Sequence, residues 1–262
     1  MGELRVDSLS KTYARREGWN RTRYLRVFED ISFTVRDGEF VSIIGSSGCG
    51  KSTLLGIAAG LAEASEGVVS LDGRPVRGPG LDRGVVFQEF ALFPWLTVLG
   101  NIRFGLRSKG VPRAEQDRIA QKYVNLVGLS GFEDYHPYRL SGGMRQRVGL
   151  ARALAIGPSA LLMDEPFGAL DAQTREAMQG ALGEIWSQTK STVLFITHDI
   201  REAIYLSDRI LVLSGRPARI SLELTVDLPR PRSRHDPAFQ RHEATLEGAL
   251  DAAVAGNANA GT

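Results

Sequence analysis

The sequence predicts an α/β fold with a parallel sheet covered by helices on both faces, and two patterns carry this prediction. Short apolar runs typical of buried strands alternate with stretches of helical periodicity, as expected where crossover helices join parallel strands. Between Thr97 and about Gly157 the pattern is mostly helical. We therefore expect a helical lobe that interrupts the strands of one sheet.

Composition is ordinary for a soluble globular protein, with 43% hydrophobic and 24% charged residues in 262. No apolar run approaches the ~18 residues of a membrane-spanning helix, and Met1 to Ser10 lacks the start of a signal peptide. The single cysteine, Cys49, excludes an internal disulfide, and a net charge of +2 does not favour nucleic-acid binding. These observations predict a cytoplasmic protein.

The first third of the chain has the pattern of strands divided by turns. Glu3 to Ser8 and Ile31 to Val35 alternate as strands, and a charged segment from Ala14 to Arg26 separates them. Turns are expected at Asp37-Gly38 and at Asp72-Gly73. Further strands are expected at Val41 to Ile44, Val68 to Leu71 and Gly84 to Gln88.

The helical stretch contains two apolar faces, after which strands and helices alternate again. The faces are Val98, Ile102 and Leu106, then Ile119, Tyr123, Leu126 and Val127. Beyond the helix stop at Gly157-Pro158 we expect a strand at Ala160 to Asp164, a helix at Ala172 to Gln188, a strand at Thr192 to Thr197, a helix at Ile200 to Leu206 and a strand at Arg209 to Leu213. The tail should supply one more strand, a Pro/Arg loop and an amphipathic run from Pro237 to Leu250.

A glycine-rich loop, GSSGCGKST, joins the strand that begins at Val41 to a helix. Glycines let backbone N–H groups turn inward around an anion at a helix N-terminus, so the pattern predicts a phosphate site. Lys51 would reach the β- and γ-phosphates, and Ser52 would hold Mg²⁺. The alternative is a Gly/Ser-rich surface turn. The loop residues are Gly45, Ser46, Ser47, Gly48, Cys49, Gly50, Lys51, Ser52 and Thr53.

Two adjacent carboxylates, Asp164 and Glu165, end the apolar run ALLMDEP. Ligands of open α/β sheets bind at the carboxyl ends of strands, and neighbouring strand residues point oppositely. Asp164 therefore suits the Mg²⁺ shell beside Ser52, and Glu165 suits work as a general base. Without a phosphate loop, the two acids could equally be an N-cap pair.

A second anion-receptive helix start is expected at LSGGMRQR, Leu140 to Arg147. Ser141 can cap this helix, and Gly142 and Gly143 leave backbone N–H groups unobstructed. The alternative is a plain N-cap. The expected apolar face is Met144, Val148, Ala151 and Ala155.

These motifs, in this order, resemble the ATPase subunit of ABC transporters over about Glu3 to Leu213. The match rests on GSSGCGKST, Gln88, LSGGMRQR, LLMDEP, GALD at Gly168 to Asp171, and His198 in FITHD. The resemblance implies a P-loop NTPase (RecA-like) mixed sheet with an antiparallel β edge and an inserted helical subdomain. It also implies a core at 1–88 and 159–230, a helical subdomain at 89–158 and a tail at 231–262.

The resemblance assigns further roles. Tyr13 would stack on adenine, Gln88 would sense the γ-phosphate and join the Mg²⁺ ligands, and His198 would contact the γ-phosphate. Ser141, Gly142 and Gly143 would cap the γ-phosphate of ATP bound to a second copy, with Asp171 near the crossing point. The implied catalytic residues are Glu165, His198 and Gln88, and the implied metal ligands are Ser52, Gln88 and Asp164.

Each of these residues also has a simpler interpretation. His198 could cap the next helix, Gln88 could be a strand-end polar residue, and Tyr13 could pack in the core. Trp19 and Tyr24 compete with Tyr13 as the stacking aromatic. The arginines of the segment are most simply a solvated face, or they touch phosphate or the membrane surface; they are Arg15, Arg16, Arg21 and Arg23.

Gln88 to Ile102 and Asp164 to Arg175 resemble the importers of nitrate, taurine and alkanesulfonates. That branch implies separate transmembrane permease subunits, a periplasmic or lipid-anchored substrate-binding protein that acts through them, and a peripheral place on the cytoplasmic face of the membrane. A permease helix would dock beside Gln88, where an aromatic cluster is expected to be exposed or, alternatively, packed within the lobe. The cluster is Phe90, Phe93, Pro94 and Trp95.

Some questions stay open at this point. The tail could pack on the sheet or on a second subunit, and the cargo could be nitrate, taurine, a sulfonate or a heterocyclic vitamin precursor. The motifs also resemble DNA-associated ABC-type ATPases, but the gap from Gln88 to Leu140 has neither heptads nor cysteine clusters. A nucleotide-binding scaffold without turnover is disfavoured because both Asp164 and Glu165 are present.

Overall fold

The structure is a computed structural model that describes residues 2–17 and 21–259. Two compact units divide the chain. The first combines Met1–Pro79 with Thr192–Thr262, and the second is Gly80–Ser191. The second unit is thus an insertion in the sequence of the first.

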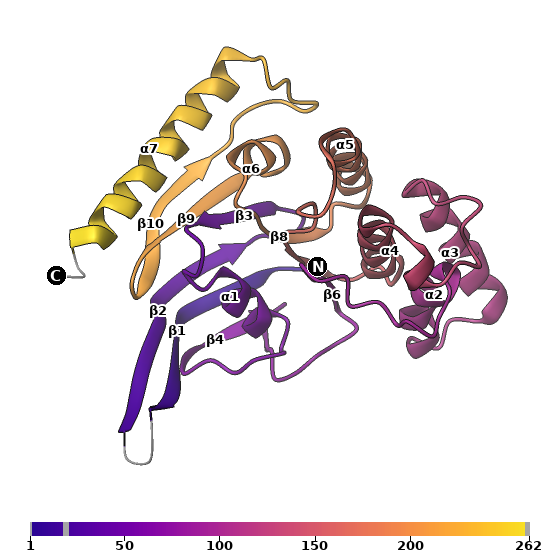
Figure 1. Cartoon of the computed structure of the whole chain (residues 1–262), viewed down its shortest axis with the longest axis horizontal. Helices are drawn as coiled ribbons and strands as arrows, with labels where there is room; N and C mark the ends of the chain where they lie inside the picture. Colours follow the sequence, from indigo (N-terminus) through magenta and orange to yellow (C-terminus); the bar gives the residue numbers. More distant parts are fainter. Residues whose placement is uncertain (1, 18–20, 260–262) are drawn as a thin grey trace. The chain divides into compact units, whose positions relative to one another are not determined.

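A mixed sheet forms the first unit, and its strand order is β5-β4-β1-β2-β10-β9-β3-β8 (Figure 1). The strands are β1 (Leu4–Glu17), β2 (Arg21–Val35), β3 (Phe40–Gly45), β4 (Glu66–Leu71), β5 (Arg74–Pro75), β8 (Thr192–Ile196), β9 (Arg209–Gly215) and β10 (Ala218–Thr225). Strand β3 pairs in parallel with β8 and β9, whereas β1 pairs antiparallel with β2 and β4. The predicted antiparallel edge is therefore confirmed.

Three helices belong to this sheet: α1 (Lys51–Ala58), α6 (Ile200–Leu206) and α7 (Pro237–Asn259). Figure 1 shows α1 on one side of the central strands and α6 with α7 on the other. Phe239 and Leu246 of α7 are buried in one cluster with Ile210 and Val212 of β9. The tail therefore packs on the chain's own sheet, which answers the question that the sequence left open.

The Pro/Arg run of the tail supplies a buried guanidinium. Arg232 donates to the carbonyl oxygens of Ile204 (2.5 Å) and Ser207 (2.6 Å), at the end of α6. Burial lowers the pKa of Arg232 to about 10. Because the last carbonyls of a helix lack intrahelical partners, this contact attaches the tail to α6.

The sequence predicted that the charged segment from Ala14 to Arg26 connects two short strands. This prediction is wrong. Strands β1 and β2 run on through the segment, and residues 12–17 pair antiparallel with residues 21–26. We call this two-stranded ribbon the arm. Since side chains on both its faces contact solvent, the arm lacks the polar and apolar alternation by which strands are recognised. Trp19 lies outside the described residues.

The second unit contains a parallel pair of strands and four α-helices in its described residues. Its elements are β6 (Arg83–Val86), β7 (Ala160–Asp164), α2 (Val98–Ser108), α3 (Arg113–Leu126), the 3₁₀ helix η1 (Pro137–Arg139), α4 (Gly142–Ala155) and α5 (Ala172–Thr189). Strand β6 ends at Val86, so Gln88 lies in the loop that follows and not at the strand end. Within the described residues, no helix is both long and apolar enough to span a bilayer.

One predicted helix face is right and another is right only in part. Val98, Ile102 and Leu106 of α2 are buried as expected. Of the second face, Val127 is buried and Leu126 is 37% exposed, while the other two predicted residues are half-buried. The buried residues within α3 are Gln116, Ala120 and Val124, one position along from the predicted face. The small side chain of Ala120 permits close packing, and Gln116 Nε2 donates to the Val111 carbonyl at 2.7 Å. Hydropathy marks neither residue. On α4, Val148, Ala151 and Ala155 are buried, whereas Met144 is half-buried.

Candidate active site

The glycine-rich loop lies between β3 and α1, and two of its glycines are required sterically. A Cβ on Gly45 would lie 2.5 Å from the Leu213 carbonyl oxygen. Gly50 has φ +100°, and its Cβ would lie 2.5 Å from Val27 Cγ1. Both positions hold the backbone tightly against β9 and β2. The loop is therefore built into the sheet and is not a free surface turn.

Lys51 is buried at the first residue of α1, and its ammonium is directed back into the loop. Nζ donates to the carbonyl oxygens of Gly45 (2.8 Å) and Ser46 (3.0 Å). Cys49 is 2% exposed and fills the space beneath the loop, while Ser47, Gly48 and Ser52 face solvent. The first N–H groups of α1 lack intrahelical partners and lie at the positive end of the helix dipole. A buried cation and a helix N-terminus together favour a bound polyphosphate.

Cross-strand register separates the candidate aromatics of the arm. Tyr13 pairs with Leu25 and Tyr24 pairs with Ala14, so the two tyrosines lie on opposite faces. Lys11, two residues before Tyr13, donates to the Glu63 carbonyl just after α1 and lies 4.8 Å from the Tyr13 ring centroid. Tyr13 therefore shares the face of α1 and its loop. It is 44% exposed, so the core-packing alternative is wrong.

His198 is exposed in the turn between β8 and α6. It does not cap α6, because Asp199 Oδ1 accepts from the backbone N–H groups of Arg201 (2.8 Å) and Glu202 (3.2 Å). The simpler interpretation of His198 is therefore wrong. The exposed imidazole lies beside the carboxyl end of a parallel strand, where ligands of such sheets bind.

In the second unit, the two acids end β7 in different environments. Asp164 is 9% exposed, and Glu165 is half-buried with a left-handed φ of +44°. Gln88 Nε2 donates to Glu165 Oε2 at 3.4 Å, which joins two predicted catalytic residues 77 positions apart. The acids do not cap the next helix, because Asp171 caps α5 by accepting from Thr174 N at 3.0 Å. Hydrogen bonds from Thr174 lower the pKa of Asp171.

Ser141 caps α4, since its Oγ accepts from Met144 N at 3.2 Å. The plain N-cap interpretation is thus correct for the oxygen, but the exposed hydroxyl keeps its own proton to donate. Gly142 and Gly143 open the helix, and a Cβ on Gly143 would lie 3.1 Å from Leu170 Cδ2. The start of α4 therefore offers a hydroxyl and backbone N–H groups to an anion.

The segment after Gln88 is held on α4 by arginines that sequence reasoning missed. The Arg145 guanidinium lies 4.8 Å from the Phe90 ring centroid, and Arg152 lies 5.6 Å from that of Phe93. Arg152 also donates to the Ala91 carbonyl at 2.6 Å. The signal was present, because two arginines seven residues apart lie on one face of a helix.

The aromatic cluster divides between the two interpretations. Phe93 is half-buried against Phe104, with ring centroids 4.3 Å apart, whereas Trp95 is 70% exposed. Two hollows of about 270 Å³ flank the Phe104 ring, one lined by Trp95 and Arg107 and the other by Phe93 and Arg152. Internal packing explains the phenylalanines, and Pro94 and Trp95 remain at the surface.

Comparison with known proteins agrees with these observations. A family model described as ABC transporter matches residues 28–168. An uncharacterized ABC transporter ATP-binding protein of Methanocaldococcus jannaschii is 52% identical over 244 residues, which is 93% of this chain and 90% of the relative. A taurine import ATP-binding protein of Burkholderia pseudomallei is 49% identical over 90% of this chain and 89% of its own length. A nitrate import ATP-binding protein of Synechocystis is 46% identical over 94% of each chain.

Solved structures show the same fold. A dimeric ATP-binding cassette in a post-hydrolysis state, with ADP and phosphate bound, has a TM-score of 0.77 and 31% identity and covers 86% of this chain. The predicted P-loop NTPase fold is thereby confirmed. With a family model matching more than half of the chain and relatives of similar length matching nearly all of it, this protein belongs to the ABC transporter family, as one of its ATP-hydrolysing subunits.

Proposed function

We propose that this chain powers an importer for a small anion such as nitrate, taurine or an alkanesulfonate. The observation that carries the proposal is that relatives named for taurine and nitrate import are nearly half identical to it over about nine-tenths of its length. No residue of this chain need touch the cargo, because a permease and its substrate-binding protein would select it.

In the first unit, the loop from Gly45 to Thr53 would hold the triphosphate. Lys51 supplies the buried charge, backbone N–H groups at the start of α1 supply donors, and Tyr13 supplies a ring for adenine on the α1 face. His198 would donate to the γ-phosphate. The steric requirement for Gly45 and Gly50 supports this assignment, because it holds the loop backbone in place against β9 and β2.

The residues present also fit Mg²⁺, which prefers oxygen ligands in octahedral geometry. The Ser52 hydroxyl, the Asp164 carboxylate and the Gln88 amide oxygen would hold it. When bound, the ion neutralises charge that develops on the phosphate oxygens. The position of Asp164 at the carboxyl end of β7 supports this role, because ligands of open α/β sheets bind at that edge.

Glu165 would accept a proton from the attacking water and orient it toward the γ-phosphate. Its hydrogen bond from Gln88 directs one oxygen of this carboxylate. Gln88 is therefore placed to couple the catalytic carboxylate to the Phe90 segment that follows it.

We also propose that two copies act together, as in the dimeric cassette of similar fold. Ser141, Gly142 and Gly143 of one copy would cap the γ-phosphate of ATP held by the other, with Asp171 near the crossing point. ATP binding then closes the pair and hydrolysis reopens it. The start of α4 supports this role, because it offers a hydroxyl and backbone N–H groups to an anion.

The surface around Trp95 would receive a cytoplasmic helix of the permease, which places the chain peripherally on the cytoplasmic face of the membrane. We also propose that the chain works as three functional parts: a core at 1–88 and 159–230, a helical subdomain at 89–158 and a tail at 231–262. We propose no nucleic-acid partner.

Phosphate release by the purified chain tests this function. We expect stimulation by its co-purified permease in liposomes with loaded substrate-binding protein, and none by double-stranded DNA. Uptake of labelled nitrate, taurine or ethanesulfonate by the same liposomes identifies the cargo. Stimulation by DNA alone would replace the importer with a DNA-associated ATPase.

A further inference from the structure

The arm is a projection without a partner from its own unit along most of its length. Residues 12–17 pair with 21–26, while β4 pairs with β1 only up to Ser10 and β10 meets β2 at Phe28. Figure 1 shows β1 and β2 continuing past the other strands toward the grey trace. A two-stranded ribbon is marginally stable in water by itself, so its persistence needs an explanation.

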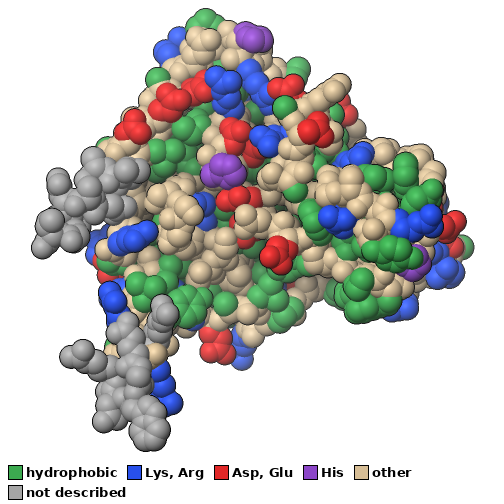
Figure 2. Space-filling model, in the orientation of Figure 1, with side chains coloured by type: hydrophobic (Ala, Val, Ile, Leu, Met, Phe, Trp, Pro, Cys, Tyr) green, Lys and Arg blue, Asp and Glu red, His purple; other side chains and the backbone are tan. Residues whose placement is uncertain are grey.

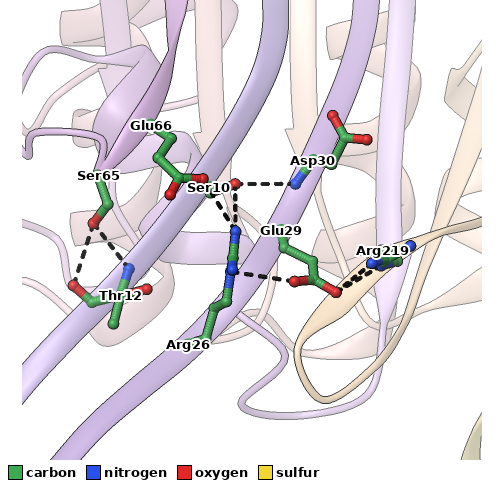
Figure 3. A network of polar contacts seen from close by, with 8 residues as sticks. All are labelled: Ser10, Thr12, Arg26, Glu29, Asp30, Ser65, Glu66 and Arg219. Atoms are coloured by element: carbon green, nitrogen blue, oxygen red, sulfur yellow. Dashed lines mark hydrogen bonds and ion pairs between the residues drawn. The ribbon is translucent and has the colours of Figure 1, made fainter.

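The base of the arm is anchored by an ionic network on the face opposite Tyr13 (Figure 3). Arg26 pairs with Glu66 of β4 (3.0 Å) and Glu29 of β2 (3.2 Å), and Glu29 in turn accepts from Arg219 of β10 (2.9 Å). Ser10 Oγ accepts from Arg26 at 3.4 Å. The acids at the base are thus engaged with cations, which fixes the direction in which the arm projects.

Beyond this base, the arm is basic, and each of its faces combines a cation with an exposed apolar side chain: Arg16 shares a face with Tyr24, and Arg23 shares the other with Leu25. Residues 14–26 contain five arginines and one glutamate. Arg16 and Arg23 are exposed, and between them and the base lie Tyr24, 72% exposed, and Leu25, 59% exposed. Figure 2 shows basic side chains in blue at the lower left of the view, where β1 and β2 lie in Figure 1. Cations next to an exposed aromatic and an exposed aliphatic side chain are typical of segments that bind at a membrane interface.

Two simpler explanations do not account for this composition. Charged side chains protect open strand edges from aggregation, but that purpose disfavours an exposed Tyr24 and Leu25. Nucleotide binding explains Tyr13 and could engage Leu25, its cross-strand neighbour. It does not explain Tyr24, which lies on the opposite face.

We propose that the arm binds the anionic headgroups of phospholipids. Arg16 on one face of the arm and Arg23 on the other contact lipid phosphates, and the Tyr24 ring lies at the level of the headgroups. This inference rests on the proposed function, because a subunit docked on a permease works beside a bilayer. It adds an attachment of the cassette to the membrane that does not pass through the permease.

Sedimentation with vesicles tests the proposal on the full chain without permease. The wild-type protein should bind phosphatidylcholine vesicles that contain one-quarter phosphatidylglycerol, and should not bind pure phosphatidylcholine. Each basic residue near an anionic surface contributes about fivefold to partitioning. The double variant Arg16→Glu/Arg23→Glu should therefore bind at least about twentyfold more weakly. Binding should fall in 0.5 M NaCl, because salt screens exposed charges.

The matched control is Arg74→Glu/Arg77→Glu, which has the same net charge and alters two exposed arginines of the same unit away from the arm. It should keep most of the binding. Tyr24→Ser should weaken binding further, and Tyr24→Phe should not. Equal loss in both double variants, or no loss in the arm variant, would overturn the proposal. Normal vesicle binding by Arg16→Glu/Arg23→Glu, together with failure of this variant to co-purify with the permease, would also overturn the proposal. It would assign the arm to a protein partner.

Phosphate release in the same preparations separates the two proposals. Wild-type turnover with loss of vesicle binding supports the arm's role and leaves the proposed function intact. Absence of permease-stimulated turnover in the wild-type protein would reject the proposed function, whatever the vesicles show.

Discussion

The chain has two helix starts suited to an anion, and they differ in what their own unit supplies. At α1, Lys51 is buried in the loop, and close contacts require glycine at Gly45 and Gly50. At α4, the Arg145 guanidinium lies beside Gly142 but is already engaged by the Leu140 carbonyl (2.6 Å) and the Phe90 ring. We expect the first site to hold polyphosphate by itself. At the second the nearby guanidinium is already engaged, so we expect that site to contribute only when another site brings the anion to it.

The largest effect should come from removing the charge of the first site. Lys51→Ala should weaken binding of a fluorescent ATP analogue by at least about a hundredfold, because a buried cation that faces polyphosphate is lost. Lys122→Ala, on the exposed surface of α3, serves as the control and should bind normally. Tight binding by Lys51→Ala would show that α4 or another surface holds nucleotide independently.

Glu165→Gln should separate binding from turnover. We expect phosphate release to fall by roughly 10²–10⁴-fold, because the amide cannot accept a proton from water, while ATP binding stays nearly intact. Dimers should accumulate with ATP on a sizing column. The control is Glu176→Gln, since Glu176 is an exposed residue of α5. A Glu165→Gln protein that is monomeric and fully active would remove the residue from catalysis.

Ser141→Ala tests the second helix start against a matched cap. Thr97 caps α2 by accepting from Gly100 N at 3.1 Å, much as Ser141 caps α4. Each alanine variant should lose about 1 kcal/mol of unfolding free energy, measured by denaturant titration. Only Ser141→Ala should also lose ATP-driven dimerisation in the Glu165→Gln background, while ADP binding by the monomer is unchanged. Equal dimerisation of both variants would make Ser141 a structural cap alone.

The smallest effect should appear at the base of the arm. Tyr13→Ala should raise the KM for ATP about five- to twentyfold, as expected for loss of ring stacking on a base, and Tyr13→Phe should restore it. Tyr24→Ala should leave KM unchanged because Tyr24 lies on the opposite face. A reversed result would move the nucleotide base to the other side of the arm.

The structure shows which parts of the fold can be predicted from patterns in the sequence. Strands β3, β7, β8 and β9 were predicted because buried runs of apolar residues have few alternatives. The arm was missed because a ribbon exposed on both faces has no apolar period. The α3 face was placed one residue away because Gln116 and Ala120 pack by hydrogen bonding and small size, which hydropathy does not measure.

The candidate site divides in the same way. Spacing along the chain was enough to predict the loop at Lys51, the acids at Asp164 and the helix start at Ser141, since each of these motifs consists of residues close together in the sequence. The contact between Gln88 and Glu165 and the arginines that hold the Phe90 segment join residues far apart in sequence. The sequence around each of these residues does not indicate which distant residue it contacts.

By itself, the amino-acid sequence determined the phosphate loop, the order of the motifs and the family, because glycine, lysine and carboxylate at fixed spacing specify local geometry. The tertiary structure alone decided that the tail packs on its own sheet, that Tyr13 and not Tyr24 lies on the α1 face, and that the arm projects as a basic ribbon. Those outcomes depend on strand register and burial, which arise only when distant segments pair.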